Sequence, residues 1–125
     1  MARNALLILL TAGLAAGLQQ KPQEPPEEDE TLATREYSFN PLQAEKELKV
    51  GNFYFKKGSY RAAALRFREA TRWNPSYAEA WLRLGEAQEK LGDQKAAREA
   101  YGKFLSLAPK HKRAAEIRKK VAGSD

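Results

Sequence analysis

Two adjoining stretches of 34 residues decide the fold. They read AEKELKVGNFYFKKGSYRAAALRFREATRWNPSY (44–77) and AEAWLRLGEAQEKLGDQKAAREAYGKFLSLAPKH (78–111). When the first is laid on the second, nine positions are identical: Ala44/Ala78, Glu45/Glu79, Leu48/Leu82, Gly51/Gly85, Lys56/Lys90, Gly58/Gly92, Ala62/Ala96, Ala63/Ala97 and Pro75/Pro109. Most of these matches fall on Gly, Ala and Pro, which occupy specific positions in a pair of helices. The period therefore indicates a repeated helical unit.

Each unit is predicted to be a helix–turn–helix, because its apolar residues recur at helical spacing on both sides of a glycine. Gly58 and Gly92 are expected to end the first helix of each unit in the left-handed conformation, with Ser59 or Asp93 beginning the next. The four predicted helices cover residues 44–57, 60–73, 77–90 and 94–107.

Further signals mark helix starts and close contacts. Asn40-Pro41 has the pattern of an N-cap followed by Pro at the first helical position. Ser76 and Glu79 have the spacing of a capping box. Gly51 and Gly85 lie mid-helix at equal register, where each costs about 1 kcal/mol relative to Ala. We therefore expect a close backbone crossing at each. The small residues Ala62, Ala63, Ala96 and Ala97 are expected to serve the same approach.

A fifth helix is predicted at about 111–121, where Ala114, Ile117 and Val121 share one face and the opposite face is charged. A helix of this kind is suited to cover the last unit of a repeat array. The predicted core includes the larger apolar side chains of both units. They are Phe67, Trp81, Leu84, Tyr101 and Leu107.

With W-x2-L-G in the first helix of the second unit, followed by Ala, an aromatic residue and Pro, the pattern resembles the tetratricopeptide repeat (TPR) family. The matching residues are Trp81, Leu84, Gly85, Ala97, Tyr101 and Pro109, and in the first unit Val50, Gly51, Tyr54, Ala63, Phe67, Ala70 and Pro75. Glu47 stands where the first unit would have Trp, and Phe104 where the second would have Ala. The resemblance implies an all-α, short right-handed solenoid of two TPR units, 44–77 and 78–111, with a capping helix in 112–125.

The resemblance also implies that the first helix of each pair lines a concave groove that binds a protein or peptide. The residues expected there by register are Glu45, Leu48, Asn52, Phe55, Lys56, Glu79, Leu82, Arg83, Glu86, Glu89 and Lys90, continued by Arg113, Glu116 and Lys120 on the cap. Of these, Glu45, Leu48, Asn52, Phe55, Glu79, Leu82, Arg83 and Glu86 are the candidate partner-binding residues.

Leu48 and Phe55 lie seven residues apart beside Asn52 and predict an apolar strip on the groove. Three explanations stay open for this strip: a peptide docks on it, Tyr37, Phe39 and Leu42 fold back over it, or a second copy covers it. Some relatives carry a carboxylate clamp for C-terminal peptides, built from Lys and Asn. Leu48 stands where that Lys would be, so this activity is not carried over.

Other charged residues have simpler interpretations. Arg61, Arg68 and Arg72 form one stripe, interpreted as a solvated face, with anionic lipid or nucleic acid as the alternative. The single histidine, His111, is interpreted as a surface residue. The absence of Cys excludes disulfides and thiolate metal sites. No phosphate loop, nucleophile elbow or H-E-x-x-H motif is present. We therefore expect no enzyme activity, no cofactor and no metal.

The N-terminal part differs in charge from the rest. Residues 1–43 have three basic and six acidic groups, against 19 and 10 in residues 44–125. Residues 1–18 have a basic Arg3, an apolar stretch and small residues at its end, which predict a secretory signal peptide, with an uncleaved inner-membrane anchor as the alternative. Residues 19–36 are rich in Pro and Glu and predict a disordered linker, and residues 37–43 predict a short arm.

These features predict a non-catalytic, exported bacterial-type TPR protein that binds a protein or peptide partner in its groove. The alternative is a self-associating structural component of an envelope assembly. We expect a periplasmic or secreted location, no nucleic-acid partner, and a membrane contact only through an uncleaved N-terminal segment.

Overall fold

The computed structural model describes residues 37–123, so the predicted signal peptide and the predicted linker lie outside the described residues. Between residues 37 and 123 the chain forms five helices and no strand. They are α2 (Pro41–Lys56), α3 (Tyr60–Trp73), α4 (Ala78–Lys90), α5 (Gln94–Leu107) and α6 (Ala114–Gly123). The all-α prediction is confirmed. None of these helices is both long and apolar enough to cross a membrane.

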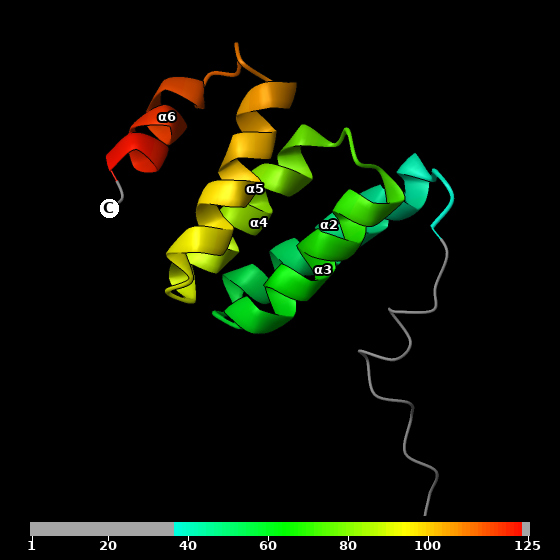
Figure 1. The fold of residues 1–125 in the computed structure, drawn as a ribbon. Helices are drawn as coiled ribbons and strands as arrows, with labels where there is room; N and C mark the ends of the chain where they lie inside the picture. The colour runs from blue at the N-terminus through cyan, green and yellow to red at the C-terminus, as the bar shows by residue number, and fades with distance from the viewer. Residues whose placement is uncertain (1–36, 124–125) are drawn as a thin grey trace, which may run out of the picture. The chain divides into compact units, whose positions relative to one another are not determined.

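The helices pack as two hairpins followed by a cap (Figure 1). In Figure 1, α2 pairs with α3, α4 pairs with α5, and α6 lies beside α5. The two hairpins are joined through the contact of α3 with α4. The predicted order of two helix pairs and a capping helix is therefore confirmed.

Local sequence explains most helix ends. The Asn40 side chain accepts a hydrogen bond from the Gln43 backbone N–H at 3.0 Å, and Pro41 begins α2, as predicted from Asn40-Pro41. This places the start of α2 three residues before residue 44. Asp93 caps α5 in the same way, accepting from Ala96 N–H at 3.1 Å. Gly58 and Gly92 have φ of 80° and 81°, a conformation that L side chains rarely adopt.

Two predicted caps are wrong in detail. Ser59 occupies the N-cap position of α3 but makes no hydrogen bond with its side chain. Ser76 lies one residue before the N-cap of α4, which is Tyr77, so the expected capping box with Glu79 does not form. Instead, the Asn74 side chain accepts a hydrogen bond from Ser76 N–H at 3.1 Å and turns the chain there.

The two mid-helix glycines allow an aromatic ring of the second helix to pack against the backbone of the first. A Cβ added to Gly51 would lie 2.5 Å from the Phe67 ring, and one added to Gly85 would lie 2.4 Å from the Tyr101 ring. The close approach is therefore confirmed, but it is a ring against a backbone rather than one backbone against another. Both rings are fully or almost fully buried.

The core consists of two clusters. The first lies between α2, α3 and α4 around Phe67, and the second lies between α4, α5 and α6 around Tyr101, Phe104 and Ile117. Phe104, where the repeat pattern would have Ala, is completely buried against α6. Trp81 packs against both clusters, and its indole N–H donates to the Pro75 carbonyl oxygen at 2.8 Å.

Two core predictions need correction or explanation. Leu107 was expected in the core but is 39% exposed, at the last residue of α5, and it belongs to neither core cluster. Glu47, which replaces the expected Trp, is largely buried. It accepts hydrogen bonds from Gln43 Nε2 at 3.1 Å and from an Arg66 guanidinium N–H at 3.2 Å.

Candidate functional site

An open hollow of about 550 Å³ lies between α2, α4 and the start of α6. Its lining is dominated by cations and contains one carboxylate. The lining residues are Lys49, Asn52, Phe53, Lys56, Glu79, Arg83 and Arg113. We call this hollow the groove, and it lies on the face where the sequence predicted partner binding.

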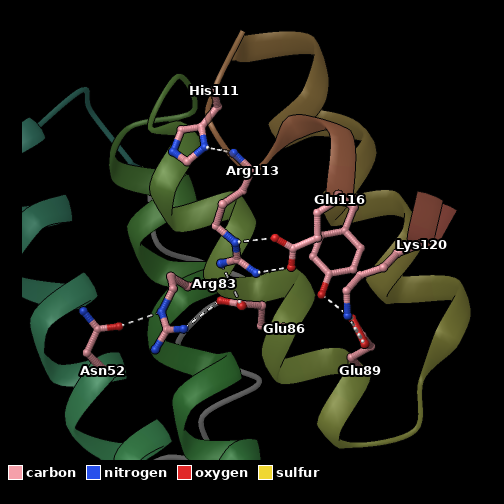
Figure 2. A network of polar contacts seen from close by, with 9 residues as sticks. Asn52, Arg83, Glu86, Glu89, His111, Arg113, Glu116 and Lys120 are labelled. Carbon is pink, nitrogen blue, oxygen red and sulfur yellow. Dashed lines mark hydrogen bonds and ion pairs between the residues drawn. The ribbon is translucent and has the colours of Figure 1, made fainter. Parts of the chain in front are cut away.

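Arg83 on α4 occupies the middle of the groove and is held from several sides (Figure 2). Its Nε donates to Asn52 Oδ1 on α2 at 3.0 Å, and its NH1 donates to Glu86 at 2.7 Å. Its guanidinium also lies over the Phe55 ring, 4.4 Å from the ring centroid. Arg83 therefore joins α2 to α4 and covers Phe55, which explains why Phe55 is only partly exposed.

Arg113, just before α6, continues this network (Figure 2). It donates from NH1 to Glu86 at 3.0 Å, and from Nε and NH2 to the two carboxylate oxygens of Glu116 at 3.0 and 2.9 Å. The hydrogen bonds to Glu116 raise the pKa of Arg113 above its ordinary value, and the bond to Glu86 adds to this. The same contact with Arg113 lowers the pKa of Glu116. Glu86 is thus shared between Arg83 and Arg113.

A second polar cluster ties α6 to α4 and α5. Lys120 donates to both carboxylate oxygens of Glu89, at 3.0 and 2.8 Å, and the Tyr101 hydroxyl also donates to Glu89. Burial raises the pKa of the Tyr101 hydroxyl, and the Glu89 contact raises it further. Burial alone would raise the pKa of Glu89, but the hydrogen bonds from Lys120 and Tyr101 outweigh it and lower that pKa.

His111 takes part in the turn before α6 and is half-buried, so it lies at the surface but has a structural contact that the sequence did not predict. Its Nδ1 accepts a hydrogen bond from the Arg113 backbone N–H at 3.0 Å, as Figure 2 shows. Its ring packs edge-on against Phe104, with 5.0 Å between the ring centroids. His111 thus helps to fix the backbone that presents Arg113 to Glu86.

Two cations of the groove are not used by the fold. Lys49 and Lys56 are exposed, and neither has an ion pair or hydrogen bond through its side chain among residues 37–123. Between them on α2, Phe53 is 54% exposed and has the Lys57 ammonium 4.8 Å from its ring centroid. The groove therefore has a paired side on α4 and an unpaired side on α2.

Burial corrects part of the predicted binding set. Leu48 is 8% exposed and Leu82 is 1% exposed, so both belong to the core and do not form an apolar strip on the groove. Leu48 packs in the cluster around Phe67, and Leu82 in the cluster around Tyr101. The structure brings together Asn52, Arg83 and Glu86, with Phe55 covered by Arg83.

The two predicted acidic residues differ in position. Glu79 lines the groove, whereas Glu45 is exposed on α2 and is not among the lining residues. Binding of a partner by these residues stays a prediction. Sequence reasoning missed Lys49 and Phe53, although both share the i, i+3, i+4, i+7 face with Asn52 and Lys56, a spacing that was visible in the sequence.

The arm does not cover the predicted strip. Phe39 is 71% exposed and Leu42 is 65% exposed, which speaks against the second of the three explanations, in which these residues fold back over the strip. Tyr37 instead packs edge-on against Trp73 at 4.9 Å between ring centroids, and its hydroxyl donates to Glu69 on α3. The arm is anchored to the end of α3, on a different element from Leu48 and Phe55.

The arginine stripe on α3 is only partly a solvated face. Arg61 is exposed, but Arg72 forms an ion pair with Glu69 at 3.7 Å and lies over the Tyr37 ring. Arg68 is half-buried and lines a separate hollow next to Trp81. Within residues 37–123 there is also no group of three His, Cys, Asp or Glu side chains that would hold a metal ion.

Comparisons with known proteins agree with the repeat. A family model described as "TPR repeat" matches residues 51–92, and one described as "Tetratricopeptide repeat" matches residues 78–111. No curated protein matches the chain significantly. Among solved structures, the chain is similar to the first TPR of Spaghetti (RPAP3) bound to the HSP90 peptide SRMEEVD. The two chains are 22% identical, and the match covers 68% of this chain and 95% of that one with a TM-score of 0.34. At this TM-score the two binding sites are not compared. The two family matches overlap the doubled unit found in the sequence, and together they identify residues 51–111 as a stretch that matches tetratricopeptide repeat models.

Proposed function

We propose that this protein is a non-catalytic module that binds a protein or peptide partner in the groove between α2, α4 and α6. The observation that carries the proposal is the unequal use of the groove's polar groups. Arg83 and Arg113 are fixed by the fold, whereas Lys49 and Lys56 remain available and Phe53 is 54% exposed. Side chains that the fold already fixes, next to free cations and an aromatic ring, suit the binding of another chain, since Arg83 and Arg113 lose little conformational freedom on binding.

The matches to tetratricopeptide repeat models support a binding role, because such repeats are typically non-catalytic scaffolds for other proteins. The carboxylates of this region whose pKa is shifted are held in structural contacts. Glu89 is held by Lys120 and Tyr101, and Glu116 is held by Arg113. The tyrosine hydroxyls that contact carboxylates, Tyr37 with Glu69 and Tyr101 with Glu89, join neighbouring elements, so the geometry favours recognition over chemistry.

We further propose that the module acts outside the cytoplasm, in the periplasm or as a secreted protein. The support for this location is the pattern of residues 1–17, in which a basic residue precedes an apolar stretch that ends in small side chains. The intact mass of the protein from its native source tests this part separately. Removal of about the first 17 residues is expected, whereas a soluble cytosolic chain that still begins with Met1 would contradict it.

The second candidate function is self-association within an envelope assembly. One observation favours it: large apolar side chains are exposed at the α2 end of the repeats. They are Phe39, Leu42, Val50 and Phe53. Contiguous exposed apolar residues often mark a protein contact, and a second copy is one way to cover them.

Site-directed photocrosslinking in the producing cell tests the proposal. A photoreactive residue replaces Lys56, which lines the groove, or Lys103, which is exposed on α5 outside it. We expect a crosslink to a different protein from position 56 and none from position 103. A crosslink only to a second copy of this chain would favour self-association. The same products from both positions, or none from position 56, would overturn binding in the groove.

A further inference from the structure

Four residues of α2 form a continuous stripe on one helix face. Lys49, Asn52, Phe53 and Lys56 follow the spacing i, i+3, i+4 and i+7, which places them side by side along about two turns. All four line the groove. The stripe therefore has a cation at each end and an aromatic ring and an amide between them.

The middle of the stripe is prepared to hold a peptide backbone. Asn52 Oδ1 is occupied by Arg83 Nε at 3.0 Å, so the amide is oriented with its NH2 group away from that arginine. This NH2 group donates no hydrogen bond to any residue within 37–123. An amide fixed in this way is able to donate to a backbone carbonyl oxygen of a ligand, because Arg83 already holds it in one orientation before the ligand binds.

The charge of the groove is not balanced by the fold. Arg83 and Arg113 share Glu86, and Arg113 also has Glu116. Lys49 and Lys56 have no carboxylate partner among the described residues, and Glu79 is the only acidic residue of the lining. A ligand that enters the groove therefore meets uncompensated positive charge at both ends of the stripe.

We propose that the groove binds an acidic segment of a partner protein, with side-chain carboxylates on Lys49 and Lys56 and an apolar side chain on the Phe53 ring. This inference rests on the proposed function and names the chemistry of the partner. The two lysines are separated by about 10 Å along the helix axis, from seven residues at 1.5 Å each. In an extended peptide, two acidic residues four positions apart lie on the same face about 13 Å apart, with the residue midway between them on that face too. The flexible lysine side chains cover the difference between these two spans.

A second copy of this chain is a poor occupant of the stripe. Residues 44–125 have 19 basic and 10 acidic groups, so the repeat part of another copy would bring further positive charge toward Lys49 and Lys56. Like charges brought together without counter-charges oppose association. The apolar surface around Phe53 is thus better matched by a partner with carboxylates on both sides of an apolar residue.

The experiment is a binding titration of the full chain with a fluorescent peptide of sequence GSEELEEGS, blocked at both ends so that only side-chain carboxylates are present. We expect the affinity to fall at least tenfold when all four Glu of the peptide are replaced by Gln. We expect the same fall for the double variant Lys49→Gln and Lys56→Gln. The matched control is Lys95→Gln with Lys103→Gln, which removes the same charge from exposed positions on α5 and should leave the affinity unchanged.

The outcomes separate this inference from the proposed function. Equal losses in the α2 and α5 double variants would show attraction by net charge alone and overturn the inference. A tenfold gain in affinity after replacing Glu27, Glu28, Asp29 and Glu30 by Gln would assign the groove to the chain's own acidic segment and also overturn it. In both cases a crosslink from position 56 to another protein would leave binding in the groove standing. Loss of that crosslink would overturn the proposed function itself.

Discussion

The two ends of the repeat array are finished in opposite ways. At the C-terminal end, α6 buries Ile117 against Leu82 and Phe104, and Arg113 just before α6 and Lys120 on it pair with acids on α4. At the N-terminal end, α2 leaves Leu42, Val50 and Phe53 exposed. Its lysines on the groove are also unpaired within residues 37–123. The same repeated unit is thus closed by its own chain on one side and open on the other.

This difference shows how a short repeat protein separates stability from binding. A helix added after the last unit converts an apolar face into core and places its cations on carboxylates, so that surface is no longer available to a partner. The first helix has no such neighbour among the described residues. Its side chains keep the free charge and apolar area that recognition requires. Substitutions in the core of the closed end should therefore affect folding, and those on the exposed face of α2 should affect binding.

The largest expected contrast is between two phenylalanines. Phe104→Ala removes a completely buried ring under α6 and should lower the free energy of unfolding by about 3–5 kcal/mol. Phe53→Ala removes a ring that is 54% exposed and should change it by at most about 0.5 kcal/mol. Urea unfolding followed by circular dichroism measures both. Similar losses in the two variants would remove the distinction between a closed and an open end.

A smaller contrast is expected between two helical glycines. Gly85→Ala places a methyl group 2.4 Å from the Tyr101 ring and should destabilise by about 1–3 kcal/mol, because the ring is packed and cannot move freely. Gly102→Ala has no atom within 4 Å of the new methyl group and should stabilise α5 by about 0.5–1 kcal/mol. Thermal melts of both variants check this. Equal melting temperatures would show that the ring–backbone contact is not tight in solution.

Sequence alone anticipated the skeleton of this fold because its decisive residues act locally. Gly58 and Gly92 end helices by their own backbone freedom, and Asn40-Pro41 and Asp93 begin them through contacts three residues away. Such contacts are encoded within one turn of helix. The apolar spacing of Ala114 and Ile117 likewise predicted which face of the cap is buried.

The surface of the groove was harder to predict because it depends on contacts between helices. Register placed Leu48 and Phe55 on an open strip, but packing against α3 and α4 buries Leu48 and brings Arg83 over Phe55. The pair Glu86–Arg113 joins residues 27 positions apart, and no local pattern specifies it. Lys49 was overlooked because an exposed lysine on a helix is ordinary until its neighbours are known.

The ion pairs of the closed end should contribute less to the free energy of unfolding than the core beneath α6. They should contribute more than the unpaired lysines of α2. Arg113→Gln removes the contacts to Glu86 and Glu116 and should cost about 1–2 kcal/mol, since Glu86 is partly buried. Lys49→Gln should change the free energy of unfolding by at most about 0.5 kcal/mol. Urea titration at low salt compares them. A cost for Lys49→Gln equal to that for Arg113→Gln would contradict the assignment of Lys49 to binding.

The smallest expected effect is a dependence on pH at the closed end. Because the pKa of Glu89 is lowered in the folded protein, its contribution is present above the ordinary carboxyl pKa of about 4.3 and is lost as the pH falls through the lowered value. Glu89→Gln should therefore be less stable than the original protein near neutral pH, and this difference should shrink below about pH 4. A difference that grows on acidification would contradict the sign of the pKa shift.

The most direct test of the open α2 face is an NMR titration of the isotope-labelled full chain with the blocked GSEELEEGS peptide. Binding to the stripe predicts saturable shifts of backbone amides in Lys49–Lys56 and at Arg83. The chemical shifts of the amides of α5, which does not line the groove, should remain unchanged. Saturable shifts centred on α3 or α5, or no shifts on α2 at saturating peptide, would contradict the assignment of this face to binding.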